Sequence, residues 1–196
     1  MIAFVQGKFV VKNPTQIIVD VNGVGYECNI SLNTYSAISN LSEGKLYTYL
    51  HITENSHTIF GFAEASEKQL FMQLISVSGV GASTARVMLS GMKPEELIQA
   101  IVQGNVKQLE SVKGIGKKTA ERIIVELKDK LSKHSFESDY YSVVSYKSNH
   151  ESDAIQALVS LGITKPVAEN AIKKVKGSNE QVIPLEDLIK LALKNL

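Results

Sequence analysis

The sequence predicts an α+β protein of several parts: an N-terminal β-barrel, a central all-α domain and a small C-terminal module of three helices. Three observations support this. Residues 1–63 contain five short runs of β-branched and aromatic residues, and the apolar spacing becomes helical from residue 64 onward. One motif of the helical part also occurs twice. A chain of 196 residues is long enough for two or three small domains.

The five runs of residues 1–63 have the composition of strands. They read IAFVQGKFVV, QIIVDV, VGYECNI, KLYTYLHI and TIFGF. Asn22 and Gly23 separate the second run from the third, and both tolerate the positive φ of a type I′ turn. Residues 31–40 can hold one short helix. Five strands with one such interruption favour a barrel of the OB type, although another five-stranded barrel or a sandwich is the alternative.

Residues 64–132 predict the all-α domain. A first helix is indicated by Leu70, Phe71, Leu74 and Ile75, and a second begins at Pro94 and stops at Gly104. A longer amphipathic helix follows, with an apolar side made of Ala120, Ile123, Ile124, Leu127 and Leu131.

Residues 133–150 are rich in serine and lack a period, which predicts a flexible linker. Residues 151–196 predict three short helices. The apolar side of the first consists of Ala154, Ile155, Leu158 and Leu161, and Gly162 closes it. Thr164 is a predicted cap of the second, and Pro184 begins the third. Such a short segment has a marginal core, so we expect it to bind a partner.

The repeat aligns LISVSGVGASTARVML (74–89) with LESVKGIGKKTAERII (109–124). The shared pattern is L-x-S-V-x-G-[VI]-G-x-x-T-A. A single G-x-G is weak support for any function. Two copies, each expected to end one helix and begin the next, are much stronger support for a paired functional element.

The two glycines of each copy have different predicted tasks. Gly79 and Gly114 are expected to end a helix in the left-handed conformation, which costs glycine little. Gly81 and Gly116 are expected to leave backbone N–H groups uncovered where the next helix begins. Such a terminus binds phosphate, and phosphate contacts carry no base sequence. The repeat therefore predicts sequence-independent DNA binding.

The residue between the glycines, Val80 or Ile115, is expected to point inward and hold the two helices together. Lys117 and Lys118 add positive charge beside the second turn. The predicted phosphate-binding set is Gly79, Val80, Gly81, Ser83, Gly114, Ile115, Gly116, Lys117, Lys118 and Arg122.

Other interpretations of the turns are weaker. A Walker A loop needs glycine at position 111, where serine stands, and a Rossmann loop needs a preceding strand and a third glycine. A turn that only packs two helices stays open as an alternative, more so for the first copy. There, Ala82 and Ser83 occupy the positions of Lys117 and Lys118.

Bulk composition limits the possible classes. The net charge is only +1, and the middle segment alone is basic, with ten basic and eight acidic side chains in residues 64–132. Directed backbone groups would therefore have to assist DNA binding. Cys28 is the only cysteine, so we expect no disulfide framework and a cytoplasmic protein. We expect no membrane span, because no apolar run is long enough.

The chain as a whole resembles the RuvA family, the Holliday-junction-binding subunits of bacterial RuvAB branch-migration complexes. Besides the repeat, which is the helix-hairpin-helix motif in tandem, the resemblance rests on NGVGYE (22–27), FGF (60–62), LSGM (89–92) and GIGKKTAERIIVELKDKL (114–131). It covers residues 1–132 by motif and the remainder by layout. It implies an OB barrel over 1–63, a helix-hairpin-helix domain over 64–132 and a UBA-like module over 151–196.

The resemblance also implies partners. These are four-way junction DNA, the hexameric RuvB ATPase docked by residues 151–196, and the RuvC resolvase, in recombination, DNA repair and the SOS response. A homotetramer, or two stacked as an octamer, would place its barrels at the junction centre. There the loop of residues 53–58 would form an acidic pin. Glu54 matches the first pin acid, whereas Asn55 stands where a second acid is usual, and Ser83 stands where the first hairpin usually has lysine.

The residues predict no catalysis, cofactor or metal site. The four histidines are scattered, and the acids form no recognisable catalytic pair. ATP hydrolysis is therefore expected of a separate chain. A helix-hairpin-helix glycosylase or nuclease is the alternative, but Asp129, the first aspartate after Gly116, lies within the predicted amphipathic helix. Further alternatives are a helical scaffold that binds no DNA and, for residues 151–196, a module with another partner.

Overall fold

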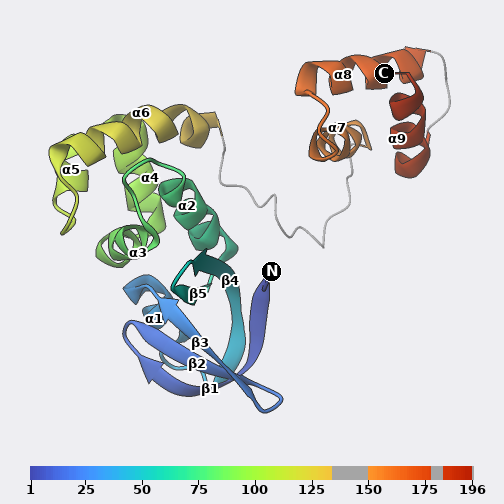
Figure 1. Cartoon of the computed structure of the whole chain (residues 1–196). Helices are drawn as coiled ribbons and strands as arrows, with labels where there is room; N and C mark the ends of the chain where they lie inside the picture. Colours follow the sequence, from blue (N-terminus) through green and yellow to red (C-terminus); the bar gives the residue numbers. More distant parts are fainter. Residues whose placement is uncertain (134–149, 178–182, 196) are drawn as a thin grey trace. The chain divides into compact units, whose positions relative to one another are not determined.

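The computed structural model describes residues 1–133, 150–177 and 183–195 (Figure 1). The predicted linker of residues 133–150 falls outside them except for its two end residues. The chain divides into two compact units, Met1–Tyr141 and Ser142–Leu196. The first unit holds the barrel and the helical domain, and the second holds the C-terminal helices.

The N-terminal part is a closed five-stranded barrel with one short helix, as predicted. Its elements are β1 (Phe4–Asn13), β2 (Gln16–Val21), β3 (Val24–Ile30), α1 (Leu32–Ile38), β4 (Glu43–Thr53) and β5 (Ser56–Phe62). The strands neighbour one another in the order β1-β2-β3-β5-β4, and β1 closes the ring by pairing with β4. The β3–β5 pair is parallel and the others are antiparallel. This is the arrangement expected of an OB barrel.

Local sequence explains the first tight turn and the barrel interior. Asn22 and Gly23 both have positive φ, 51° and 89°, so the predicted β2–β3 turn is confirmed. The buried side chains alternate along the strands, as on Ile17 and Val19, and form a core of their own. Cys28 belongs to this core, and burial raises the pKa of its thiol to about 12, which keeps the sulfur protonated and unreactive.

The helical domain contains α2 (Ala65–Ile75), α3 (Ala82–Gly91), α4 (Pro94–Gln103), α5 (Val106–Glu110) and α6 (Lys117–Lys133). The predicted boundaries of α4 are confirmed, because Pro94 occupies its first turn and Gly104 ends it with φ of 70°. The short helix α5 was not assigned a range of its own from the sequence. Its length of five residues gives too little apolar periodicity to recognise.

The helical domain has a second core, which reaches into the barrel through β5. Phe60 and Phe62 of β5 pack on Phe71 of α2, with ring centroids 5.1 and 5.0 Å apart. Only Ala63 and Glu64 separate the end of β5 from the start of α2. The two domains of this unit are therefore joined by both a short connection and an aromatic contact.

A buried carboxyl group lies where the two domains meet. Glu67, in the first turn of α2, is 3% exposed and accepts hydrogen bonds from the hydroxyl groups of Ser31 and Thr34. Burial raises the pKa of Glu67 above its ordinary value. The two hydroxyl groups act in the opposite direction, and the nearby charge of Glu64 adds to the rise.

This raised pKa predicts a dependence of stability on pH. The folded chain keeps the Glu67 proton at pH values where an unfolded chain, with a glutamate pKa of about 4.3, has lost it. Lowering the pH from about 7 to about 5 should therefore raise the melting temperature of the natural chain relative to a Glu67→Gln variant. Thermal melts of both chains over a pH series measure this difference. If the melting temperatures of the two chains changed equally with pH, the raised pKa of Glu67 would be contradicted.

In its described residues the C-terminal unit contains α7 (His150–Ser160), α8 (Lys165–Gly177) and α9 (Leu185–Lys194), so the prediction of three helices is confirmed for this part of the chain. Small side chains, including Ala154, Ala168 and Ala192, make up much of its core. The prediction for Leu161 was wrong. Helix α7 ends at Ser160, and Leu161 is 64% exposed, because the chain already turns toward Gly162, whose φ is 91°.

Candidate nucleic-acid interface

The two copies of the repeat form two turns with matching backbone geometry. Gly79 and Gly114 have φ of 91° and 93°, so their predicted left-handed conformation is confirmed. In the first turn the N–H of Val80 donates to the Val77 carbonyl at 3.0 Å, and in the second the N–H of Ile115 donates to the Val112 carbonyl at 3.1 Å. The repeated sequence therefore produces a repeated structure.

The residues between the glycines point inward. Val80 is 4% exposed and Ile115 is 5% exposed, and both belong to the core of the helical domain. This confirms their predicted packing role. Any contact of these two residues with a ligand would use the backbone, because their side chains are committed to the core.

The second glycine of each turn stands where the next helix begins. Gly81 is the N-cap of α3, where no side chain caps the helix, and its carbonyl accepts the N–H of Ala85 at 2.9 Å. Gly116 precedes α6 in the same way, and its carbonyl accepts the N–H of Ala120 at 3.0 Å. Both helices thus present an N-terminal end, with its partial positive charge, beside an exposed glycine.

The fold itself does not require glycine at positions 81 and 116. Neither residue has positive φ, and a Cβ atom built on either would meet no atom within 4 Å. By contrast, the positive φ of Gly79 and Gly114 would strain any other residue. A bare backbone at positions 81 and 116 instead leaves room for a group from outside to approach the amides closely.

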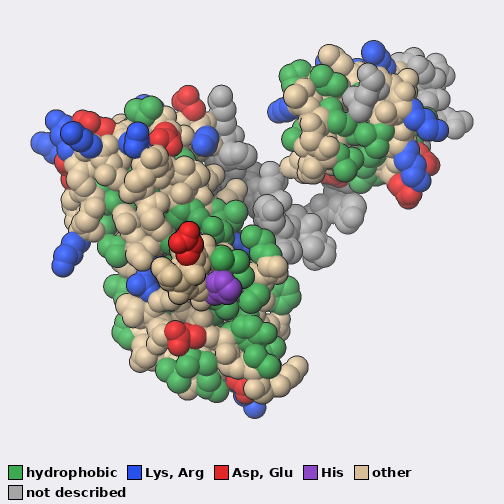
Figure 2. Space-filling view, viewed as in Figure 1, with side chains coloured by type: hydrophobic (Ala, Val, Ile, Leu, Met, Phe, Trp, Pro, Cys, Tyr) green, Lys and Arg blue, Asp and Glu red, His purple; other side chains and the backbone are tan. Residues whose placement is uncertain are grey.

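Positive charge is concentrated at the second turn. Lys113, Lys117 and Lys118 are all exposed there, and Figure 2 shows basic side chains over the end of the helical domain where α5 and α6 meet. The Nζ atom of Lys117 lies 4.0 Å from a carboxylate oxygen of Glu121. Both side chains are exposed, so water strongly screens the attraction between their charges. In the first turn the corresponding predicted residue, Ser83, is exposed and uncharged.

Lys113 was missed in the prediction from sequence. It precedes Gly114 directly and is exposed beside it. Its counterpart in the first copy is Ser78, so the comparison of the two copies contained a signal for this lysine, as it did for Lys117 and Lys118.

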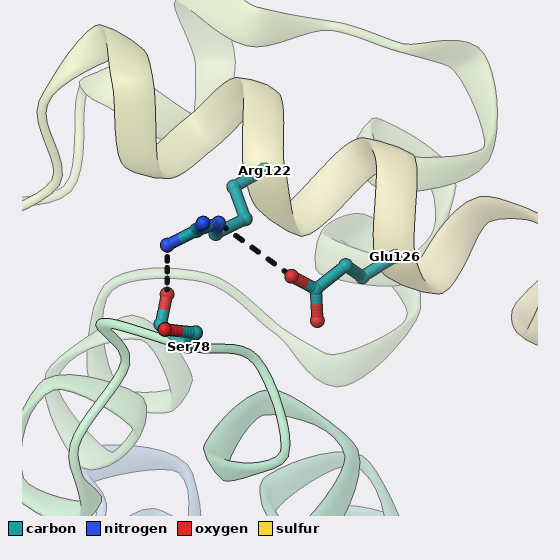
Figure 3. A network of polar contacts seen from close by, with 3 residues as sticks. All are labelled: Ser78, Arg122 and Glu126. Carbon is teal, nitrogen blue, oxygen red and sulfur yellow. Dashed lines mark hydrogen bonds and ion pairs between the residues drawn. The ribbon is translucent and has the colours of Figure 1, made fainter.

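Arg122 connects the two turns (Figure 3). From α6, its Nη1 donates to the Ser78 carbonyl in the first turn at 3.3 Å, and its Nε lies 3.6 Å from a carboxylate oxygen of Glu126. Its side chain is still 55% exposed. The guanidinium predicted to touch phosphate therefore also fixes the second hairpin against the first.

The predicted pin is a tighter structure than the sequence indicated. The loop was expected to span residues 53–58, but β4 continues to Thr53 and β5 starts at Ser56. Ile52 pairs with His57 and Thr53 with Ser56, so the paired strands continue up to the turn. Glu54 and Asn55 alone form the exposed tip, which thus carries a single acidic side chain.

In the part of the chain that the structure describes, no group of three or more His, Cys, Asp or Glu side chains could hold a metal ion. Asp129 is exposed within α6. None of the described helices combines the length and the apolar character needed to cross a membrane.

Comparison with known proteins gives matches along most of the chain. The family described as RuvA N terminal domain matches residues 1–61, the SAM-like helix-hairpin-helix tandem matches 71–129, and the RuvA C-terminal domain matches 149–196. A protein of Cytophaga hutchinsonii is 47% identical over 99% of both chains, and one of Flavobacterium psychrophilum is 46% identical over both full lengths. A protein of Neisseria meningitidis is 43% identical over 100% of this chain and 99% of its own. Each is named Holliday junction branch migration complex subunit RuvA. With this similarity over its whole length, the chain belongs to the RuvA family.

Proposed function

We propose that this chain binds four-way DNA junctions, independently of sequence, as the non-catalytic subunit of a RuvAB branch-migration complex in recombination and repair. One observation carries the proposal: Gly81 and Gly116 are bare at two helix N-termini although the fold does not need glycine there. A phosphate is the ligand that such a site favours, because the free amides donate to it and the helix dipole attracts its charge.

The proposed grip uses both turns of each protomer. Backbone N–H groups around Gly79–Gly81 and Gly114–Gly116 would bind phosphate oxygens, and Lys117 and Lys118 would add charge at the second turn. Each charge-assisted bond contributes roughly 1.5–3 kcal/mol. Arg122 would hold the two sites at a fixed separation while its exposed edge reaches the backbone. Because these contacts avoid the bases, DNA shape and not sequence would determine binding.

The low net charge is consistent with this function if four protomers act together. A homotetramer would present about eight turns to one junction, and its symmetry would match four DNA arms. The barrels would lie at the centre, where the tip of Glu54 and Asn55 would repel phosphates at the crossover. With one acid at this tip, the repulsion per protomer would be weaker than that of a tip with two.

The family and the separate C-terminal unit support further proposed partners. We expect residues 150–196 to dock on the RuvB ATPase, which would supply ATP hydrolysis from a separate chain, and the RuvC resolvase to act on the same junction. A second tetramer could close over the DNA to form an octamer. Chromosomal DNA as the substrate implies action in the cytoplasm.

The experiment that tests the proposal is a competition between two DNAs. A synthetic four-way junction should be bound in preference to a linear duplex of the same sequence, measured by gel shift. With about eight phosphate contacts, junction affinity should fall by about 10⁴-fold between 50 and 200 mM salt. Equal affinity for the two DNAs would refute junction binding, and a flat salt dependence would refute the phosphate grip.

A further inference from the structure

A polar cluster lies between the barrel and the helical domain. The cluster consists of Ser31, Asn33, Thr34, Glu67 and Ser90, and we call it the α1 clamp. It connects α1, the helix of the barrel, with α2 and α3 of the helical domain. Nothing in the proposed grip on DNA uses these residues. Glu67 is a buried carboxyl group, and burial of such a group costs free energy unless hydrogen bonds compensate for the lost water.

The hydrogen bonds around Glu67 form a closed set. The Ser31 and Thr34 hydroxyls each donate to one oxygen of the carboxyl group, the latter at 2.6 Å. The same hydroxyl oxygens accept backbone N–H groups, that of Thr34 at 3.0 Å and that of Ala63 at 3.1 Å. Ala63 belongs to the connection between β5 and α2. Glu67 therefore fixes the start of α1 and the start of α2 to each other.

The other half of the clamp holds the end of α3. The Asn33 side-chain amide donates to the carbonyls of Leu89 and Met92 at 2.6 and 2.9 Å. The backbone N–H of Leu32 donates to the Ser90 hydroxyl at 3.1 Å. These bonds attach the last turn of α3 to the barrel helix that Glu67 fixes.

We propose that Glu67 is a positioning residue: through the α1 clamp it sets the orientation of the hairpin turns relative to the barrel, and this orientation produces the preference for branched over linear DNA. The proposal rests on the proposed function. The clamp can have this effect because α3 joins it to the first turn, although Arg86 of α3 also donates to the Asn29 side-chain oxygen of the barrel at 2.7 Å. Gly81 stands at one end of α3 and the clamp holds the other.

Geometry gives the scale of the effect. Helix α3 has 10 residues, so it is about 15 Å long. A rotation of roughly 10° about its clamped end would move the turn by about 3 Å, the full length of a hydrogen bond. Arg122 joins the second turn to the first, so both would move together.

Linear and branched DNA should respond differently to such a rotation. A linear duplex can be held by the hairpin pair of one protomer, whose own core keeps the two turns together. A junction requires hairpins of several protomers to meet four arms at once, so their orientation on the barrels is critical. Loosening the clamp should therefore weaken junction binding and spare duplex binding.

The test compares Glu67→Gln with Glu64→Gln in the full chain. Glutamine keeps the shape of Glu67 and replaces one acceptor oxygen by an amide donor. Glu64 is its exposed neighbour at the N-cap of α2, so the control makes the same substitution outside the clamp. We expect Glu67→Gln to lower junction affinity about tenfold with duplex affinity within about twofold, and Glu64→Gln to change neither.

Several outcomes would overturn the inference. A folded Glu67→Gln chain whose junction-to-duplex affinity ratio equals that of the natural chain would do so, as would equal losses on both DNAs. If Glu67→Gln does not fold, Asn33→Ala decides, because it removes the α3 half of the clamp and leaves the buried carboxyl group intact; an unchanged ratio then refutes the clamp. A natural chain without junction preference would instead refute the proposed function itself.

Discussion

Replacing Gly116 with aspartate should lower the affinity for a four-way junction by at least about 100-fold and leave the fold intact. A Cβ atom at this position meets nothing within 4 Å, and the residue lacks positive φ, so the folded chain accepts the side chain. The new carboxylate would occupy the approach of a phosphate and repel it. Gel shift with a synthetic junction measures the loss, and thermal melting checks the fold.

Three further glycine variants separate blockage from misfolding. Gly116→Ala adds bulk without charge and should give an intermediate loss. Gly91→Ala is the matched control, because Gly91 lies at the other end of α3 from Gly81. A Cβ atom built at Gly91 would lie 3.8 Å from Val112 Cγ2, an ordinary contact distance, so binding should not change. Gly114→Ala should instead lower the melting temperature, because φ at this position is 93°. Natural affinity in a folded Gly116→Asp chain would remove this turn from the proposed site.

Removing residues 150–196 should abolish stimulation of the RuvB ATPase and leave junction affinity unchanged. The C-terminal helices have a core of their own and form a separate compact unit, so we expect the rest of the chain to fold without them. ATP hydrolysis by RuvB, measured with junction DNA and each form of the chain, tests the docking role. Stimulation by the shortened chain would contradict it.

A single substitution in the C-terminal unit can also test docking on the RuvB ATPase. Among the described residues of the C-terminal unit, four large apolar side chains are 41–64% exposed and are the candidates for a contact with the ATPase: Val159, Leu161, Val167 and Leu193. Leu161→Ser should lower ATPase stimulation several-fold without unfolding the unit. Gln156→Ala, an exposed polar position of α7, serves as its control and should stimulate normally.

The features that the sequence predicted well depend on local rules. Asn22-Gly23 determines its turn by its own backbone preferences, and the two G-x-G turns need only a left-handed glycine and an inward apolar residue. The five strands and the one helix of residues 1–63 were predicted from local composition, whereas the strand order β1-β2-β3-β5-β4 came from the structure. The sequence shows glycine at positions 81 and 116. Only the structure shows that a larger residue would fit there, because a Cβ atom built at either position meets no other atom within 4 Å.

The features that the sequence could not give depend on contacts between distant segments. Glu67 lies more than thirty residues from Ser31 and Thr34, and no pattern along the chain pairs them. Arg122 and Ser78 are 44 positions apart in the sequence, so the hydrogen bond between them could not be predicted from the sequence either. Leu161 was misassigned because an apolar residue next to a helix end has the same spacing whether it points inward or outward.

The open space around the Cα atoms of Gly81 and Gly116 affects how substitutions at these positions would score in a mutational screen. A screen that scores only how much folded protein accumulates would accept alanine at both positions, because neither backbone angle nor packing opposes it. Under the proposed function, a screen for survival after chromosome breakage would disfavour the same substitutions. Disagreement between the two screens would therefore mark the surface that handles nucleic acid without any knowledge of a bound complex.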